Sequence, residues 1–241
     1  MSPARKHPSG AGAARERAEL VRIEADDVLL WGDLALPRSP RGLVVFAHGG
    51  GSSRHSPRNR HVAERLRAAG FGTLLFDFLT LREEGRRHGP LSHELLTERL
   101  RATTAWALRE AETSGLPLGY FGSASGVAAV LASAAARPDV VHAVVCRGGR
   151  PDRVADLLEH VVAPTLLVVG ELDPVSLAMN QQCAVELGGP WELAIVEGAD
   201  HLFQEPGALD EVARSAVRWF GRHLRLRPAE RHPLTPAMSP P

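Results

Sequence analysis

The sequence of 241 residues has few cysteines, a single lysine and no long apolar run, and each of these scarcities argues against a class of protein. It has two cysteines, Cys146 and Cys183, and no CxxC pattern, which argues against a disulfide framework and against cysteine zinc or redox chemistry. No apolar run is long enough to cross a bilayer, and residues 1–18 lack the apolar core of a signal peptide. Lys6 is the only lysine, and the formal net charge is zero. We therefore expect a cytoplasmic protein with a small-molecule ligand and no nucleic-acid or membrane partner; a homo-oligomer is left open.

Metal and cofactor motifs are also missing. The eleven histidines include no HExxH or comparable spacing, so we expect no metal site. The glycines at 49–51 are followed by no Gly-Lys-Ser/Thr and do not have GxGxxG spacing, which disfavours a phosphate loop. We expect no cofactor.

The order of apolar segments predicts an α/β fold. Strands are expected at 20–25, 28–36, 42–47, 73–76, 118–121, 140–146, 165–169 and 191–196, and helices at 60–69, 93–112, 126–136, 152–159, 176–187 and 208–224. The first two strands form a hairpin at Asp26-Asp27, and the alternation after them is typical of a mostly parallel sheet with helices on both faces. We expect one domain over 19–225, a disordered arm at 1–18 and a disordered Pro-rich tail at 226–241. The interval 147–164 is too short for a large lid domain, which predicts an open, shallow pocket.

The segment after residue 121 has the glycine spacing of a nucleophile elbow. This turn joins a buried strand to a helix and is written Gly-x-Ser-x-Gly, because its central residue is strained and its flanking positions must be small. Here Gly122 and Gly126 flank Ala124. The hydroxyl that the chemistry needs is therefore absent from the central position.

Two neighbouring serines are the alternatives to this frame. With Ser123 at the centre, Phe121 would fill a position that needs a small residue. With Ser125 at the centre, the β-branched Val127 would fill the other. Only the frame centred on Ala124 has glycine at both positions, so we interpret Ala124 as the nucleophile position.

Two polar residues follow later strands in the order acid, then base. Asp173 comes just after the strand at 165–169, and His201 just after the strand at 191–196. The carboxyl ends of parallel strands share one edge of a sheet, so these side chains are expected near the elbow. There His201 would accept a proton, and Asp173 would fix its tautomer. Asp200, adjacent in sequence, and Glu171 are weaker alternatives to Asp173.

Backbone donors and arginines complete the expected site. Gly50, in the run at 48–51, and Ser125 are expected to offer backbone N–H groups to an oxyanion, although a plain Gly-rich turn is the simpler alternative. Arg54, Arg58 and Arg147 are assigned to the pocket as a hypothesis, and would favour an anionic substrate.

Several motifs together resemble one family. They are FAHGGGSSRHSPRN at 46–59, LFD at 75–77, VCRGGRPD at 145–152, PTLLVVG at 164–170 and HLFQEPG at 201–207. With the elbow, Asp173 and His201, the chain resembles the dienelactone-hydrolase-like branch of the α/β-hydrolase superfamily over about 20–224. It is most similar to small hydrolases found beside or fused to phosphoribosyltransferase domains in bacteria. The resemblance implies the α/β-hydrolase fold and Ser at position 124. Dienelactone hydrolases proper have Cys there, and this chain has neither.

Two functions follow from this departure. The first is hydrolysis of ester or related acyl bonds by a Ser-His-Asp type site, with Ala124 making the chain inactive or weakly active. The second is a non-catalytic pseudo-hydrolase that binds a small molecule or regulates. Because Asp173, His201 and the oxyanion glycines are all present, a long-decayed site is disfavoured.

Overall fold

The computed structural model describes residues 17–86 and 88–225. Strand β1 begins at Arg17, two residues before the expected start of the domain at 19. The rest of the expected disordered arm and the tail at 226–241 lie outside the described residues. Within the described ranges, no helix combines the length and apolar character that a bilayer span needs.

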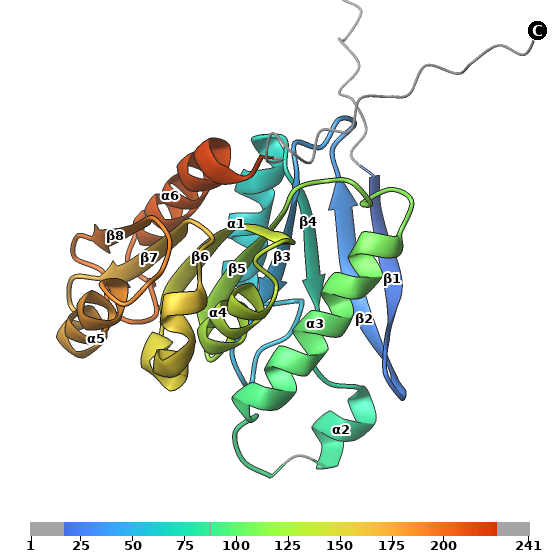
Figure 1. The fold of residues 1–241 in the computed structure, drawn as a ribbon, viewed down its shortest axis with the longest axis horizontal. Helices are drawn as coiled ribbons and strands as arrows, with labels where there is room; N and C mark the ends of the chain where they lie inside the picture. The colour runs from blue at the N-terminus through green and yellow to red at the C-terminus, as the bar shows by residue number, and fades with distance from the viewer. Residues whose placement is uncertain (1–16, 87, 226–241) are drawn as a thin grey trace, which may run out of the picture.

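The described residues form one eight-stranded sheet with the order β1-β2-β4-β3-β5-β6-β7-β8 (Figure 1). Strands β1 and β2 form an antiparallel hairpin, β2 also pairs antiparallel with β4, and every other pairing is parallel. The strands are β1 (Arg17–Ala25), β2 (Val28–Leu36), β3 (Leu43–Ala47), β4 (Gly72–Phe76), β5 (Leu118–Ala124), β6 (Val141–Gly149), β7 (Thr165–Gly170) and β8 (Trp191–Val196). The predicted α/β fold with an N-terminal hairpin is confirmed.

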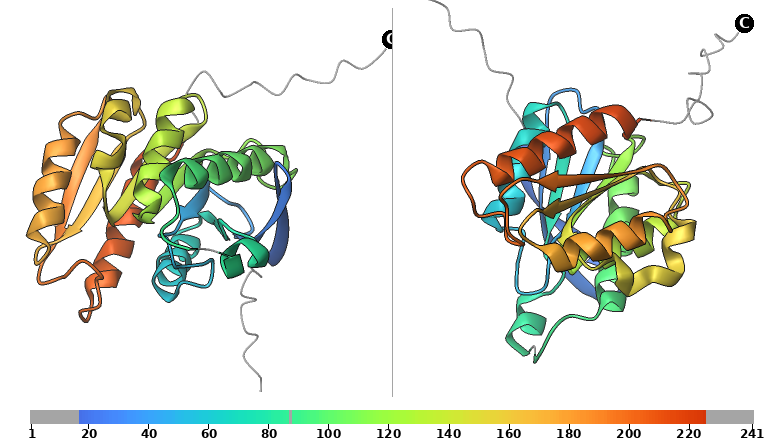
Figure 2. Two further views of the ribbon diagram at one scale, coloured as in Figure 1. Left: turned by 90° about the horizontal axis from the view of Figure 1, so that it is seen from below. Right: turned by 90° about the vertical axis from the view of Figure 1, so that its left-hand side faces the viewer.

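Helices cover both faces of this sheet (Figures 1 and 2). They are α1 (Pro57–Ala68), α2 (Leu81–Arg86), α3 (His93–Arg109), α4 (Gly126–Ala136), the 3-10 helix η1 (Pro151–His160), α5 (Pro174–Ala184) and α6 (Ala208–His223). One core cluster joins the sheet to α3, α4, η1 and α5, and the other joins it to α1 and α6. No large lid domain is seen among the described residues, as predicted.

The central strands are apolar on both faces because both faces are covered. All five residues of β3 and all nine of β6 are buried. Along β6, Val144 and Cys146 join the core under α4, whereas Ala143 and Val145 join the core under α1 and α6. The same alternation determines on which face of the sheet each side chain at the end of β6 lies.

The sequence predicts all the elements except α2. None of the six residues of α2 is buried, and such a short exposed helix has no apolar periodicity from which it could be predicted. It follows β4 and projects beyond the carboxyl edge of the sheet in Figure 1.

Candidate active site

The turn at Ala124 has the backbone geometry of a strained elbow. Ala124 ends β5 with φ +50°, and α4 begins two residues later at Gly126. A Cβ on Gly126 would lie 2.2 Å from the Ala47 carbonyl oxygen, and one on Gly122 would lie 2.6 Å from Val130 Cγ2. Both flanking positions therefore require glycine, as expected for the frame centred on Ala124.

Asp173 and His201 are in direct contact. Asp173 Oδ2 lies 2.7 Å from His201 Nδ1, and Asp173 Oδ1 accepts the backbone N–H of Ser176 as the N-cap of α5. Partial burial raises the pKa of the Asp173 carboxyl, but the hydrogen bonds from Ser176 and His201 outweigh it and place that pKa below its ordinary value. The carboxylate is thus ionised at neutral pH and orients an imidazole that is half exposed.

The two weaker alternatives to Asp173 are engaged elsewhere. Asp200 Oδ1 accepts the backbone N–H groups of Leu202 and Phe203, and so closes its own turn. Glu171 Oε2 accepts the backbone N–H of Gly198. Neither carboxylate has a hydrogen bond to the imidazole of His201.

Residues at the end of β6 connect the elbow to the imidazole. Gly149 pairs with Ala124, and a Cβ on Gly149 would lie 2.5 Å from the Ala124 carbonyl oxygen. A Cβ on the preceding Gly148 would lie 3.8 Å from His201 Cε1. Residues 124, 173 and 201 therefore converge at one edge of the sheet. Gly148 and Gly149 were not expected to shape the site, although two glycines after a buried strand are a signal of close backbone approach.

The expected oxyanion donors also lie beside the elbow. A Cβ on Gly49 would be 2.8 Å from Ala124 Cβ and 3.5 Å from the Ser125 nitrogen, so only glycine leaves this space open. The Gly50 N–H donates to Ser125 Oγ at 2.7 Å. This expected donor is therefore occupied by a hydroxyl here.

The three arginines assigned to the pocket do not gather. The Arg54 side chain pairs with both Asp33 and Asp77. Arg58 is exposed on the first turn of α1, and Arg147 is buried at the end of β6, where the two cations repel each other. Ser123, the strand neighbour of Arg147, donates a hydrogen bond to Asn59, the residue after Arg58, so Arg147 lies under the first turn of α1 near Arg58. Arg54 belongs to a separate ion-pair cluster.

A cavity of about 690 Å³ adjoins the glycine-rich run at 48–51, called the oxyanion loop from here on. Its lining includes Arg54, one of the three arginines assigned to the pocket, with His48 and Gly51 on the loop, the exposed Trp31, and residues 77–81, 84 and 91 around α2. The expectation of a shallow pocket omitted this wall, because α2 was not predicted. Burial lowers the pKa of His48, whose Nδ1 donates to the Gly49 carbonyl, so this imidazole is neutral at pH 7.

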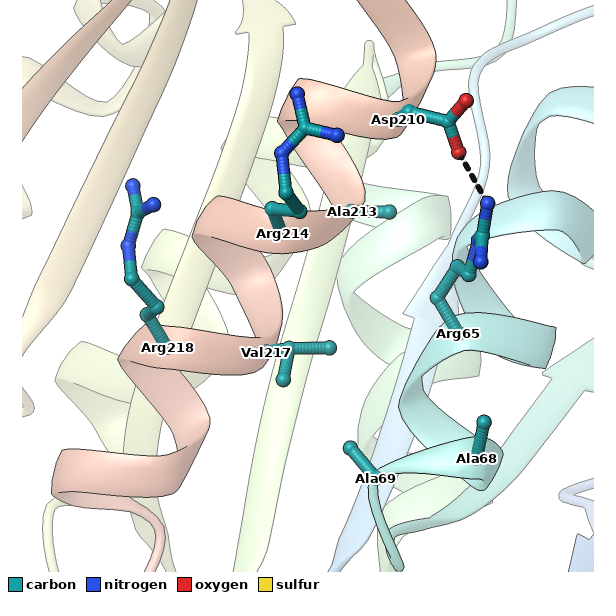
Figure 3. A pocket seen from close by; sticks show the side chains of 8 residues that line it. All are labelled: Arg65, Ala68, Ala69, Asp210, Ala213, Arg214, Val217 and Arg218. Carbon is teal, nitrogen blue, oxygen red and sulfur yellow. Dashed lines mark hydrogen bonds and ion pairs between the residues drawn. The ribbon is translucent and has the colours of Figure 1, made fainter.

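A second hollow contains none of the expected site residues. This groove of about 500 Å³ lies between α1 and α6, and its lining includes Ala69, Ala213 and Val217 (Figure 3). Figure 3 shows Arg65 and Asp210 facing each other across it, 2.7 Å apart. Among the residues that the structure describes, no set of three His, Cys, Asp or Glu side chains is arranged to hold a metal ion.

Comparisons with known proteins agree with this geometry. The family described as "Alpha/beta hydrolase domain" matches residues 40–218. A crystallised dienelactone hydrolase from Anabaena variabilis is 46% identical, with a TM-score of 0.85 over 87% of this chain and 99% of that one. A CIB-like hydrolase from Thermoplasma acidophilum shares the fold at 18% identity, with a TM-score of 0.68 over 86% of this chain and 99% of that one.

Curated relatives from two strains of Mycobacterium tuberculosis are named provisionally as phosphoribosyl transferases. They are 51% identical over 208 residues, which cover 86% of this chain and 47% of theirs. The chain thus spans about half the length of the curated relatives that it matches. The family match, the sheet order and the 46% identity to a dienelactone hydrolase lead to one conclusion: the chain belongs to the α/β-hydrolase family and has its dienelactone-hydrolase-like form.

Proposed function

We propose that this chain is a scaffold for hydrolysis of ester or related acyl bonds, with Ala124 at the position of the nucleophile. The observation that carries the proposal is the 2.7 Å contact between Asp173 and His201 at the same sheet edge as the strained elbow. An Asp–His contact by itself is common in proteins, so its position beside the elbow is what makes it informative. An ionised acid, an oriented imidazole and a left-handed elbow in one place are the parts of a nucleophilic hydrolase.

In the Ala124→Ser form, the serine Oγ would attack the acyl carbon while His201 Nε2 takes its proton. Asp173 would stabilise the resulting imidazolium, and the Ser125 N–H would stabilise the oxyanion. The Gly50 N–H would become a second donor to the oxyanion once its hydrogen bond to Ser125 Oγ is broken. The cavity beside the oxyanion loop supplies room for one side of the substrate.

With Ala124 present, no covalent acyl intermediate can form at this position. Removing one triad member still leaves roughly 10³–10⁴-fold acceleration over water in such enzymes, from the oxyanion site and binding. Water activated by His201 in the space of the missing hydroxyl would give weak turnover. We therefore expect the unmodified chain to be inactive or weakly active.

A non-catalytic role is the second candidate. The absence of a nucleophilic hydroxyl at Ala124 favours a binding role, because a cavity that could hold a ligand is present although the nucleophile is not. In this role, the chain would bind a small molecule at the same edge of the sheet. The matched half of the Mycobacterium relatives corresponds to the hydrolase domain, so their name carries no transferase activity to this chain.

The decisive experiment compares the unmodified chain with Ala124→Ser. Both are assayed with a panel of activated esters and with a fluorophosphonate probe, and the labelled residue is identified by peptide mass. Labelling and turnover in the serine form alone support the hydrolase scaffold. Inactivity of both forms, with tight small-molecule binding, supports the second candidate. Labelling of Ser123 or Ser125 in the unmodified chain would show that the elbow frame is misplaced.

A further inference from the structure

Arg147 is a buried cation with no acidic partner among the described residues. Its relative exposure is 9%, and its Nη1 is shielded from solvent without a hydrogen-bond acceptor. Burial, and then the charge of Arg58, lower the pKa of Arg147 to about 10. An uncompensated buried charge costs several kcal/mol in general, so a fold that keeps one normally has a counter-ion for it.

Arg99 shows how this same fold satisfies a buried arginine. It is 8% exposed, close to the value for Arg147. Its guanidinium donates to the Ala25 carbonyl and to Glu83 Oε1, both at 3.0 Å. Within residues 17–86 and 88–225, Arg147 has neither kind of partner. The difference is therefore specific to the environment of Arg147.

That environment is the first turn of α1. Arg147 pairs with Ser123 across β5 and β6, so the two side chains point to the same face of the sheet. The Ser123 hydroxyl donates to Asn59 Oδ1 at 3.4 Å, which places this face directly under α1. Arg58 stands next to Asn59, and the N-terminus of α1 adds the positive end of a helix dipole. Three positive features thus meet at one place.

The same place borders the candidate active site. The Phe203 ring lies 6.0 Å from the Arg147 guanidinium carbon. A Cβ on Gly148, the next residue, would be 3.5 Å from that ring and 3.8 Å from His201 Cε1. An anion held by Arg147 and Arg58 would therefore lie on the α1 side of the acid–base pair.

We propose that Arg147 and Arg58 form an oxyanion subsite that holds a carboxylate or phosphate group of the ligand. Guanidinium groups suit this role because their planar donors match both oxyanions in a two-point contact. The link to the substrate rests on the proposed hydrolase function, whereas anion binding itself does not.

The test titrates inorganic phosphate and, separately, acetate into the unmodified chain by calorimetry, with chloride holding the ionic strength constant. We expect saturable binding, weakened about tenfold or more in Arg58→Gln, since a charge-assisted hydrogen bond contributes roughly that factor. Arg60→Gln, an equal charge change on the same helix at a side chain that lines a different hollow beside Asp33, should bind as the unmodified chain does. Tighter phosphate binding would assign a phosphate ester, and tighter acetate binding a carboxylate.

Arg147→Met gives an independent measurement. Replacing an unpaired buried cation by an apolar side chain of similar length should raise the thermal midpoint in chloride and abolish the further rise on adding the preferred anion. The proposal is overturned if neither anion binds beyond chloride, or if Arg58→Gln and Arg60→Gln behave alike. Because these experiments use the chain with Ala124, their outcome is independent of whether Ala124→Ser hydrolyses an ester.

Discussion

Ala124 and Gly149 face each other where β5 and β6 end, so closely that a Cβ on Gly149 would lie 2.5 Å from the Ala124 carbonyl oxygen. The end of β6 therefore fixes the backbone of Ala124 at its left-handed φ of +50°. A residue with a Cβ is strained in this conformation by about 1–2 kcal/mol. The fold bears that strain although position 124 has no hydroxyl to present.

Ala124→Gly should raise the free energy of unfolding by about 0.5–1 kcal/mol. The relief of left-handed strain exceeds the extra chain entropy that glycine loses on folding. Ala129→Gly, a buried position inside α4, should instead lower it by about 1 kcal/mol or more. Urea unfolding of both variants measures the two signs. A loss of stability in Ala124→Gly would show that the elbow is not strained.

Gly49→Ala should abolish most of the activity of the Ala124→Ser enzyme. The added methyl would lie 2.8 Å from the Cβ of residue 124 and fill the space beside the Ser125 nitrogen. Loss of an oxyanion-site contact costs about 10²–10³-fold in kcat, and we expect a similar reduction. Gly221→Ala in α6 is the matched control, because no atom lies within 4 Å of its added Cβ. Equal effects of the two substitutions on kcat would contradict this geometry.

Asp173→Asn should flatten the acid side of the stability profile. The folded-state pKa of Asp173 lies below its ordinary value of about 3.9, so the folded state binds this proton less readily than the unfolded state does. The stabilisation is present above that ordinary value and is lost as the pH falls through the folded-state pKa. Unfolding free energies between pH 5 and the acid limit measure the slope, with Asp27→Asn in the exposed hairpin turn as the control. An unchanged slope in Asp173→Asn would argue against this assignment.

The two cysteines should be inert in the folded protein. Cys146 and Cys183 are 1% and 7% exposed, and burial raises the pKa of each thiol. Thiolate is the reactive form, so neither should be modified by a thiol reagent over minutes, and both should react after denaturation. Mass spectrometry before and after unfolding makes the comparison. Rapid native labelling of Cys146 would mean that the core under α4 opens far more often than its packing implies.

The sequence alone determined the order of strands and helices, since apolar periodicity and glycine punctuation are local properties of the chain. It also defined the elbow frame, because only one frame has glycine on both sides of its centre. Helix α2 escaped detection, and with it one wall of the cavity, because six exposed residues have no periodic signal.

Which charged groups lie together became clear from the three-dimensional fold. The sequence favoured Asp173 over Asp200 and Glu171 but left all three open, and the structure shows that Asp173 is the one in contact with His201. Arg54 and Arg147 looked alike as pocket arginines, but Arg54 has two carboxylate partners, whereas Arg147 is buried without one in the part of the chain that the structure describes. Hydrogen-bond partners and desolvation depend on segments far apart in the chain that folding brings together. Local sequence patterns therefore cannot predict which of these side chains come within hydrogen-bond distance of each other.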